Sequence, residues 1–131
     1  MSQLIEILQH IQKRPGMYFS DPHNAHSIYA LNAFILGYQT GQHSADKSND
    51  LDCFREWIGL HYHTLVDNQG WIDLILERVK SDPKLAFEEF FHLLPGYAKD
   101  RQELGRDEIH SRFSAAQEEL WEQFKKDLEK Q

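Results

Sequence analysis

Residues 82–94 read DPKLAFEEFFHLL, and this stretch decides the fold class. Asp82 places a capping carboxylate before Pro83, whose ring suits the first position of an α-helix. The residues that follow carry more apolar side chains than one narrow helical stripe can hold: Leu85, Ala86, Phe87, Phe90, Phe91, Leu93 and Leu94. Because so wide an apolar face needs neighbours on several sides, this segment predicts the most buried helix. The Pro-Gly pair at 95–96 predicts its end, with 97–105 as a loop holding at most a helical turn.

Two helices are predicted upstream of residue 42. Residues 2–13 repeat Leu and Ile at helical spacing, and Ser2 can cap their start. The Asp-Pro pair at 21–22 predicts the start of a second helix, which Gly41 ends. Its apolar stripe is Ile28, Leu31, Phe34, Ile35 and Tyr38, and its thin positions for close helix approach are Ala30, Ala33 and Gly37.

Residues 42–50 are polar without a period and predict a loop. Asn49 or Asp50 then caps a third helix, whose apolar side is Leu51, Phe54, Trp57, Ile58 and His61. A fourth helix is predicted over 71–80, since its wide apolar face follows the turn signal at 67–70.

A long helix is predicted from Arg106 onward. Its apolar residues are Ile109, Phe113, Ala116, Leu120, Phe124 and Leu128, a spacing that follows an ordinary α-helix and drifts from a strict heptad. Packing of this stripe on the rest of the chain is expected, with coiled-coil dimerisation as the alternative. No segment alternates as a strand does, so the sequence predicts an all-α bundle of five or six helices in one domain, 1–131.

Size and composition place the chain among small globular proteins. It has 131 residues, a mass of 15.5 kDa and a formal net charge of −7. A lone Cys53 excludes an internal disulfide and a cysteine-based zinc site. No apolar run approaches a membrane span and the first residues lack a signal-peptide pattern, so a cytoplasmic protein without membrane association is expected.

The acidic charge is concentrated in the middle of the sequence. Residues 46–89 hold ten acidic against five basic residues, a net charge of −5. Such a segment repels phosphates, so direct nucleic-acid binding is not expected. It would attract a basic protein and speed its association, although an acidic surface also serves solubility alone.

Catalytic and metal-binding motifs are absent from the sequence. The closest histidine pairs, at 23 and 26 and at 61 and 63, lack a carboxylate partner or the spacing that places two ligands on one helix face. Acidic neighbours of Cys53 would raise its thiol pKa and make it a poor nucleophile. The paired carboxylates at 88–89, 107–108 and 118–119 diverge on their helices. We therefore expect no catalysis, no metal and no cofactor.

A set of short matches resembles small helical immunity proteins of contact-dependent growth inhibition and other polymorphic toxin systems. The matches are Arg14-Pro15-Gly16-Met17-Tyr18, Phe34-Ile35-Leu36-Gly37-Tyr38, Phe54-x-x-Trp57-Ile58, Gly70-Trp71 and Ala86-Phe87-x-x-Phe90-Phe91-x-Leu93-Leu94. They span residues 11–94 and are mostly core-type positions. The resemblance implies a cytoplasmic protein that binds a toxin domain, commonly a nuclease, and blocks its active or substrate-binding surface.

The functional hypothesis is therefore an immunity protein, a monomer or weak homodimer, against a basic toxin domain such as an RNase. The candidate partner-binding residues are Asp46, Asp50, Asp52, Glu56, Tyr62, His63, Asp73, Glu77, Glu88 and Glu89. The alternatives are a helical adaptor or regulatory domain with a different protein partner, and a small enzyme or ligand-binding domain that uses Arg14, Tyr18 and a histidine.

Overall fold

The structure is a computed structural model that describes residues 3–15, 26–42 and 51–130. These residues form six α-helices and no strand, which confirms the predicted all-α fold class. The helices are α1 (Gln3–Lys13), α2 (Ile28–Gln42), α3 (Phe54–Tyr62), α4 (Trp71–Arg78), α5 (Pro83–Glu103) and α6 (Arg106–Glu129).

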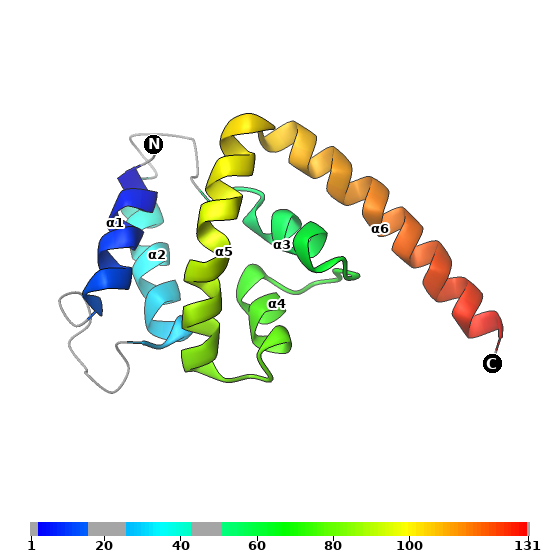
Figure 1. Ribbon diagram of the computed structural model, residues 1–131, viewed down its shortest axis with the longest axis horizontal. Coiled ribbons are helices and arrows are strands. Elements are labelled where there is room, and N and C mark those ends of the chain that lie inside the picture. The colour runs from blue at the N-terminus through cyan, green and yellow to red at the C-terminus, as the bar shows by residue number, and fades with distance from the viewer. Residues whose placement is uncertain (1–2, 16–25, 43–50, 131) are drawn as a thin grey trace.

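Helix α5 is the centre of the arrangement (Figure 1). It contacts α1 and α2 on one side and α4 on the other, and α6 continues from its far end. Seven of its side chains are buried, as the wide apolar face predicts. Phe90 and Tyr97 of α5 both meet the ring of Phe54 from α3 edge-on, with centroids 5.6 and 4.9 Å away. The predicted start of α5 is also confirmed, because the Asp82 carboxylate accepts hydrogen bonds from the backbone N–H groups of Lys84 and Leu85.

The predicted end of α5 is wrong, because the helix runs through Pro95 and Gly96 to Glu103. Proline removes one backbone hydrogen bond, but side chains beyond it hold this helix in place. Tyr97 is fully buried, and the indole N–H of Trp57 donates to Asp100 at 2.9 Å. Gly96 makes room for the approach, since a Cβ there would lie 3.3 Å from Trp57 Cζ2. Packing therefore outweighs the local helix-breaking preference.

Helix α2 also begins later than predicted, at Ile28. Residues 21–22 lie outside the described ranges, and Ser27 supplies the local start signal by accepting a hydrogen bond from the N–H of Tyr29. The predicted core stripe holds, with Ile28, Leu31 and Ile35 buried and Phe34 and Tyr38 half-buried. The thin face does not serve the predicted helix approach: Ala33 and Gly37 are exposed, and no described atom lies within 4 Å of a Cβ added at Gly37.

Helices α3 and α4 have unusual ends. The expected caps at 49–50 lie outside the described residues, and α3 begins at Phe54 after Cys53, which adopts a left-handed conformation with φ 55°. Helix α4 ends at Arg78, two residues before the predicted end. Lys80 and Ser81 then take positive φ values of 57° and 65°, which turns the chain sharply toward α5.

Only the first half of α6 packs as predicted. Ile109 is fully buried against the bundle, and the ring of Phe113 lies over Gly59 of α3. Past α3 the helix projects away from the other helices (Figure 1). Trp121, Phe124 and Leu128 are 50, 42 and 53 % exposed, which corrects the expectation that the whole stripe packs within the chain.

No helix in the described part of the chain combines the length and the apolar character needed to cross a membrane.

Candidate functional site

A groove of about 490 Å³ lies between the end of α4 and the first turns of α5. Its lining combines apolar, cationic and anionic side chains: Arg78, Val79, Lys80, Leu85, Glu88, Glu89 and His92. The left-handed pair at 80–81 creates it, because the turn brings α5 back beside α4. This turn is fixed by a 2.7 Å hydrogen bond from the N–H of Ser81 to the carbonyl of Leu76.

Tyr62 supports one wall of the groove. Its hydroxyl donates a 2.9 Å hydrogen bond to Glu89 Oε2, and the guanidinium carbon of Arg78 lies 4.7 Å from its ring centroid. Burial, followed by the contact with the Glu89 carboxylate, raises the pKa of Tyr62, so the phenol remains a neutral donor. Three side chains from α3, α4 and α5 are thus held in fixed relation, which lowers the entropic cost of binding a partner here.

The rim of the groove is open to contact. Leu85 is 47 % exposed, and Glu88 is exposed with no hydrogen bond or ion pair within the described part of the chain. His92 is also exposed, and its Nδ1 lies 3.6 Å from Glu89 Oε1. A free carboxylate beside an apolar side chain can receive a lysine or arginine together with its aliphatic stem.

Three of the candidate residues therefore meet at one place, namely Tyr62, Glu88 and Glu89. Three others are exposed elsewhere. His63 ends α3 with a left-handed φ of 51°, and the carboxylate of Asp73 accepts a hydrogen bond from the N–H of Gly70. Glu77 accepts one from Gln69.

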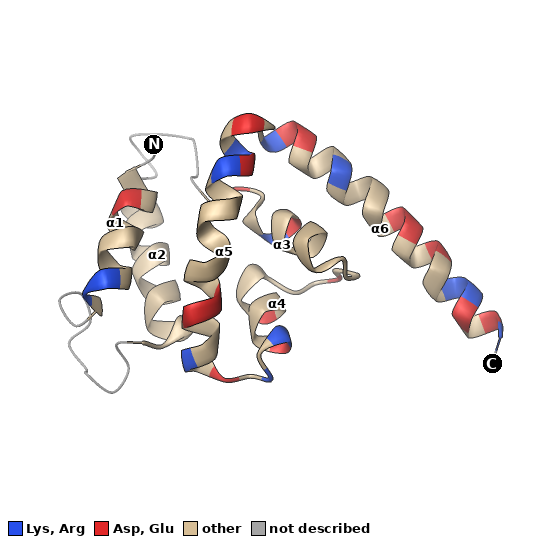
Figure 2. Cartoon of the chain, viewed as in Figure 1, with Lys and Arg blue, Asp and Glu red and all other residues tan. Residues whose placement is uncertain are grey.

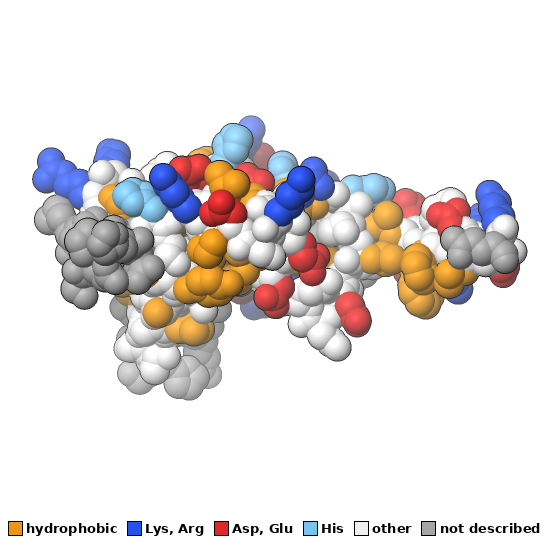
Figure 3. All heavy atoms as spheres, turned by 90° about the horizontal axis from the view of Figure 1, so that it is seen from below, with side chains coloured by type: hydrophobic (Ala, Val, Ile, Leu, Met, Phe, Trp, Pro, Cys, Tyr) orange, Lys and Arg blue, Asp and Glu red, His pale blue; other side chains and the backbone are white. Residues whose placement is uncertain are grey.

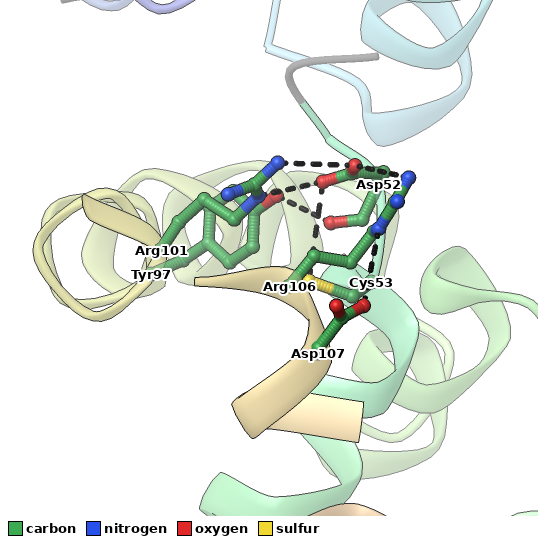
Figure 4. Close-up of polar contacts among 6 residues, drawn as sticks. All are labelled: Asp52, Cys53, Tyr97, Arg101, Arg106 and Asp107. Carbon is green, nitrogen blue, oxygen red and sulfur yellow. Dashed lines mark hydrogen bonds and ion pairs between the residues drawn. The ribbon is translucent and has the colours of Figure 1, made fainter. Parts of the chain in front are cut away.

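Asp52, in the turn before α3, forms an ion-pair cluster with residues of α5 and α6 (Figure 4). Its two carboxylate oxygens lie 2.8 and 3.2 Å from Nε and Nη2 of Arg101, and Nη1 of Arg106 is 3.7 Å away. The hydroxyl of Tyr97 donates to the Asp52 carbonyl at 2.5 Å. The hydrogen bonds that the Arg101 guanidinium donates to the Asp52 carboxylate raise the pKa of Arg101, and burial opposes this effect. Asp52 thus holds the start of α6 in place relative to α3 and α5.

Cys53 lies beside this cluster, and its thiol pKa is raised, as the sequence predicts. Burial, reinforced by the charge of Asp52, raises the pKa of its thiol to about 11. Glu56, another candidate partner-binding residue, is half-buried, and its Oε1 lies 3.7 Å from Nη1 of Arg55. Asp46 and Asp50 lie outside the described residues.

Lys and Arg positions accompany Asp and Glu positions along the described helices (Figure 2). On the face seen in Figure 3, basic side chains are interspersed among the acidic ones. The site residues predicted from the sequence did not include Arg78, Leu85 or His92. An arginine in the last turn of α4 was a usable signal, because guanidinium groups stack on aromatic rings.

Metal-binding geometry is not found in the described ranges, where no three His, Cys, Asp or Glu side chains are grouped to hold an ion.

Comparisons of this chain with protein-family models, curated proteins and solved structures each found no match.

Proposed function

We propose that this chain is an immunity protein that binds a cationic toxin domain, a nuclease, and blocks its active or substrate-binding surface. The observation that carries the proposal is the groove between α4 and α5, where the fixed Arg78–Tyr62–Glu89 stack lies beside the free carboxylate of Glu88. Tyrosine and arginine in a preorganised site are the residue types that dominate protein–protein binding energies. The net charge of −7 is favourable for binding a basic toxin, and the resemblance of short stretches of the sequence to immunity proteins suggests the same function.

The proposed mechanism has two steps. The net negative charge attracts the basic toxin over distance and raises the association rate at low salt. Glu88 then receives a lysine or arginine that the toxin would otherwise direct at nucleic-acid phosphate, while Leu85 packs on its aliphatic stem. Inhibition is stoichiometric, and no bond is made or broken by this protein.

The test is co-expression with the toxin domain encoded next to this protein, scored by cell survival and by co-purification. Glu88→Lys is expected to slow association at low salt by at least tenfold. Glu103→Lys is the matched control, since it makes the same charge change at the exposed other end of α5.

Survival together with a complex that is sensitive to Glu88→Lys and insensitive to Glu103→Lys supports the proposal. If both variants slow association equally, the net charge of the protein, and not the groove, determines the association rate. Cell death without a complex contradicts the immunity function for that toxin.

A further inference from the structure

The outer half of α6, residues 118–129, carries an apolar stripe that nothing in the described chain covers. Trp121, Phe124 and Leu128 are roughly half exposed, and Leu120 is partly buried beside them. Figure 3 shows hydrophobic side chains gathered on this projecting part of the helix. The rings of Trp121 and Phe124 stack with centroids 5.4 Å apart, so they present one continuous surface. Patches of this kind on soluble proteins mark contact surfaces.

This stripe continues the face that already packs within the chain. Ile109, Phe113 and Gln117 face α3 and the segment after it, and the stripe follows from them at the same helical period. The core-facing side of α6 therefore continues past Gln117. Beyond that residue α3 no longer covers it.

We propose that the occupant of this stripe is the same stripe of a second copy, paired antiparallel about a two-fold axis. The charge distribution favours this partner. Residues 117–122 contain three glutamates and no base, whereas residues 125–130 contain three lysines against two acids. Antiparallel pairing places the acidic half of each helix beside the basic half of the other, and parallel pairing places like beside like.

One charged pair defines the orientation. Glu118 and Lys125 are seven residues apart, about two turns, so they lie on the same edge of the stripe. In an antiparallel pair each edge faces the same edge of the partner, which brings Glu118 of one copy toward Lys125 of the other, twice by symmetry. Among the described residues, Nζ of Lys125 lies 3.0 Å from Glu122 Oε1 and 5.9 Å from the ring centroid of Trp121. The ion pair with Glu122 is solvent-exposed and easily exchanged.

The experiment is sedimentation equilibrium of the full chain alone, from micromolar to millimolar concentration. The expected result is a concentration-dependent mass that rises from 15.5 kDa toward twice that value. Phe124→Asp is expected to weaken the dimer at least tenfold. Gln123→Asp is the matched control, because it adds the same charge at a neighbouring exposed position and leaves the dissociation constant within about twofold.

A charge exchange tests the orientation. Glu118→Lys and Lys125→Glu are each expected to weaken self-association severalfold, whereas their double variant regains it. An equimolar mixture of the two single variants also regains it, because each supplies the charge that the other lost. Circular dichroism confirms that every variant remains folded.

Several outcomes would overturn the proposal. A single mass of 15.5 kDa up to millimolar concentration excludes self-pairing. If Phe124→Asp leaves the dissociation constant unchanged, the dimer uses another surface. If neither the double variant nor the mixture regains self-association, the antiparallel orientation is excluded. Because toxin is absent from this assay, its failure is distinct from failure of the immunity function.

Discussion

The two halves of α6 share one apolar period but have opposite surroundings. In the first half Ile109 is fully buried, and Gln117 bonds both the N–H of Val66 and the carbonyl of Thr64 at 2.9 and 2.8 Å. In the second half Trp121, Phe124 and Leu128 remain exposed. The difference follows from length. At 1.5 Å per residue, the 24 residues of α6 extend about 36 Å, whereas the nine residues of α3 extend about 14 Å.

The apolar side of a helix and the covering of that side are two different properties. The period identifies which side of a helix avoids water. Whether that side is covered depends on how far the neighbouring element extends. Four pairs of variants test whether the two halves of α6 differ in this way.

The largest expected effect comes from truncating one apolar side chain in each half. Ile109→Ala should lower the free energy of unfolding by about 2–5 kcal/mol, because it leaves a cavity in the core. Leu128→Ala should change it by less than about 0.5 kcal/mol at a protein concentration where the chain is monomeric. Urea unfolding followed by circular dichroism measures both, and similar losses would mean that the outer half is covered within the chain.

The next effect tests the close approach of α3 and α6 at Gly59. A Cβ there would lie 2.8 Å from Val66 Cγ2 and 2.9 Å from Phe113 Cε1, so Gly59→Ala should cost about 1–3 kcal/mol of stability. Gly37→Ala in α2 is the control, since no described atom lies within 4 Å of a Cβ added there, and it should be neutral or stabilising by up to about 1 kcal/mol. A neutral Gly59→Ala in thermal unfolding would contradict the tight packing of the inner half.

A smaller effect is expected from the last contact of the inner half. Gln117→Ala removes two hydrogen bonds to partly buried backbone groups and should cost about 1–2 kcal/mol. Gln123→Ala removes only an exposed bond to Asp127 and should change stability by less than about 0.5 kcal/mol. Amide exchange at Val66 provides the local readout: it should accelerate in the first variant alone.

The smallest effect concerns the reactivity of two thiols, one at Cys53 just before α3 and one introduced on the outer half of α6. With a pKa of about 11 against an ordinary 9.0, Cys53 carries about a hundredfold less thiolate at pH 7 than an unperturbed cysteine. Its alkylation should therefore be slow and rise roughly tenfold per pH unit up to about pH 11. A second thiol introduced by Gln123→Cys, on the exposed half, should react much faster, as mass spectrometry of the modified peptides would show.

The raised pKa of the Cys53 thiol also makes stability depend on pH. Because the unfolded thiol ionises first, the free energy of unfolding falls as pH rises from about 9 to about 11. Equal alkylation rates for the two thiols in the native state would contradict a partly buried Cys53 beside the Asp52 carboxylate. Equal rates in denaturant are the control.

Much of the helical fold follows from local chemistry. The Asp82 cap, the apolar width of α5 and the start of α6 at Arg106 were all predictable, because capping and periodicity act within a few residues. The end of α5 was not, since Pro95 is tolerated only because Trp57 and Tyr97 pack and bond beyond it.

The candidate site divides in the same way. Glu88, Glu89 and Tyr62 were nominated from charge and aromatic character, and they meet at the α4–α5 groove. Asp52 was nominated by the same logic, but the structure directs its carboxylate to Arg101. The sequence does not show which acidic residue meets an arginine 49 positions away.

The sequence by itself determined that this chain is helical, where several helices begin and which of their sides are apolar, because these properties depend on dihedral preference, capping and spacing. Tertiary structure alone decided which apolar sides are covered and which carboxylates are free. Those outcomes depend on the relative lengths and directions of helices, and on ion pairs between residues far apart in the chain.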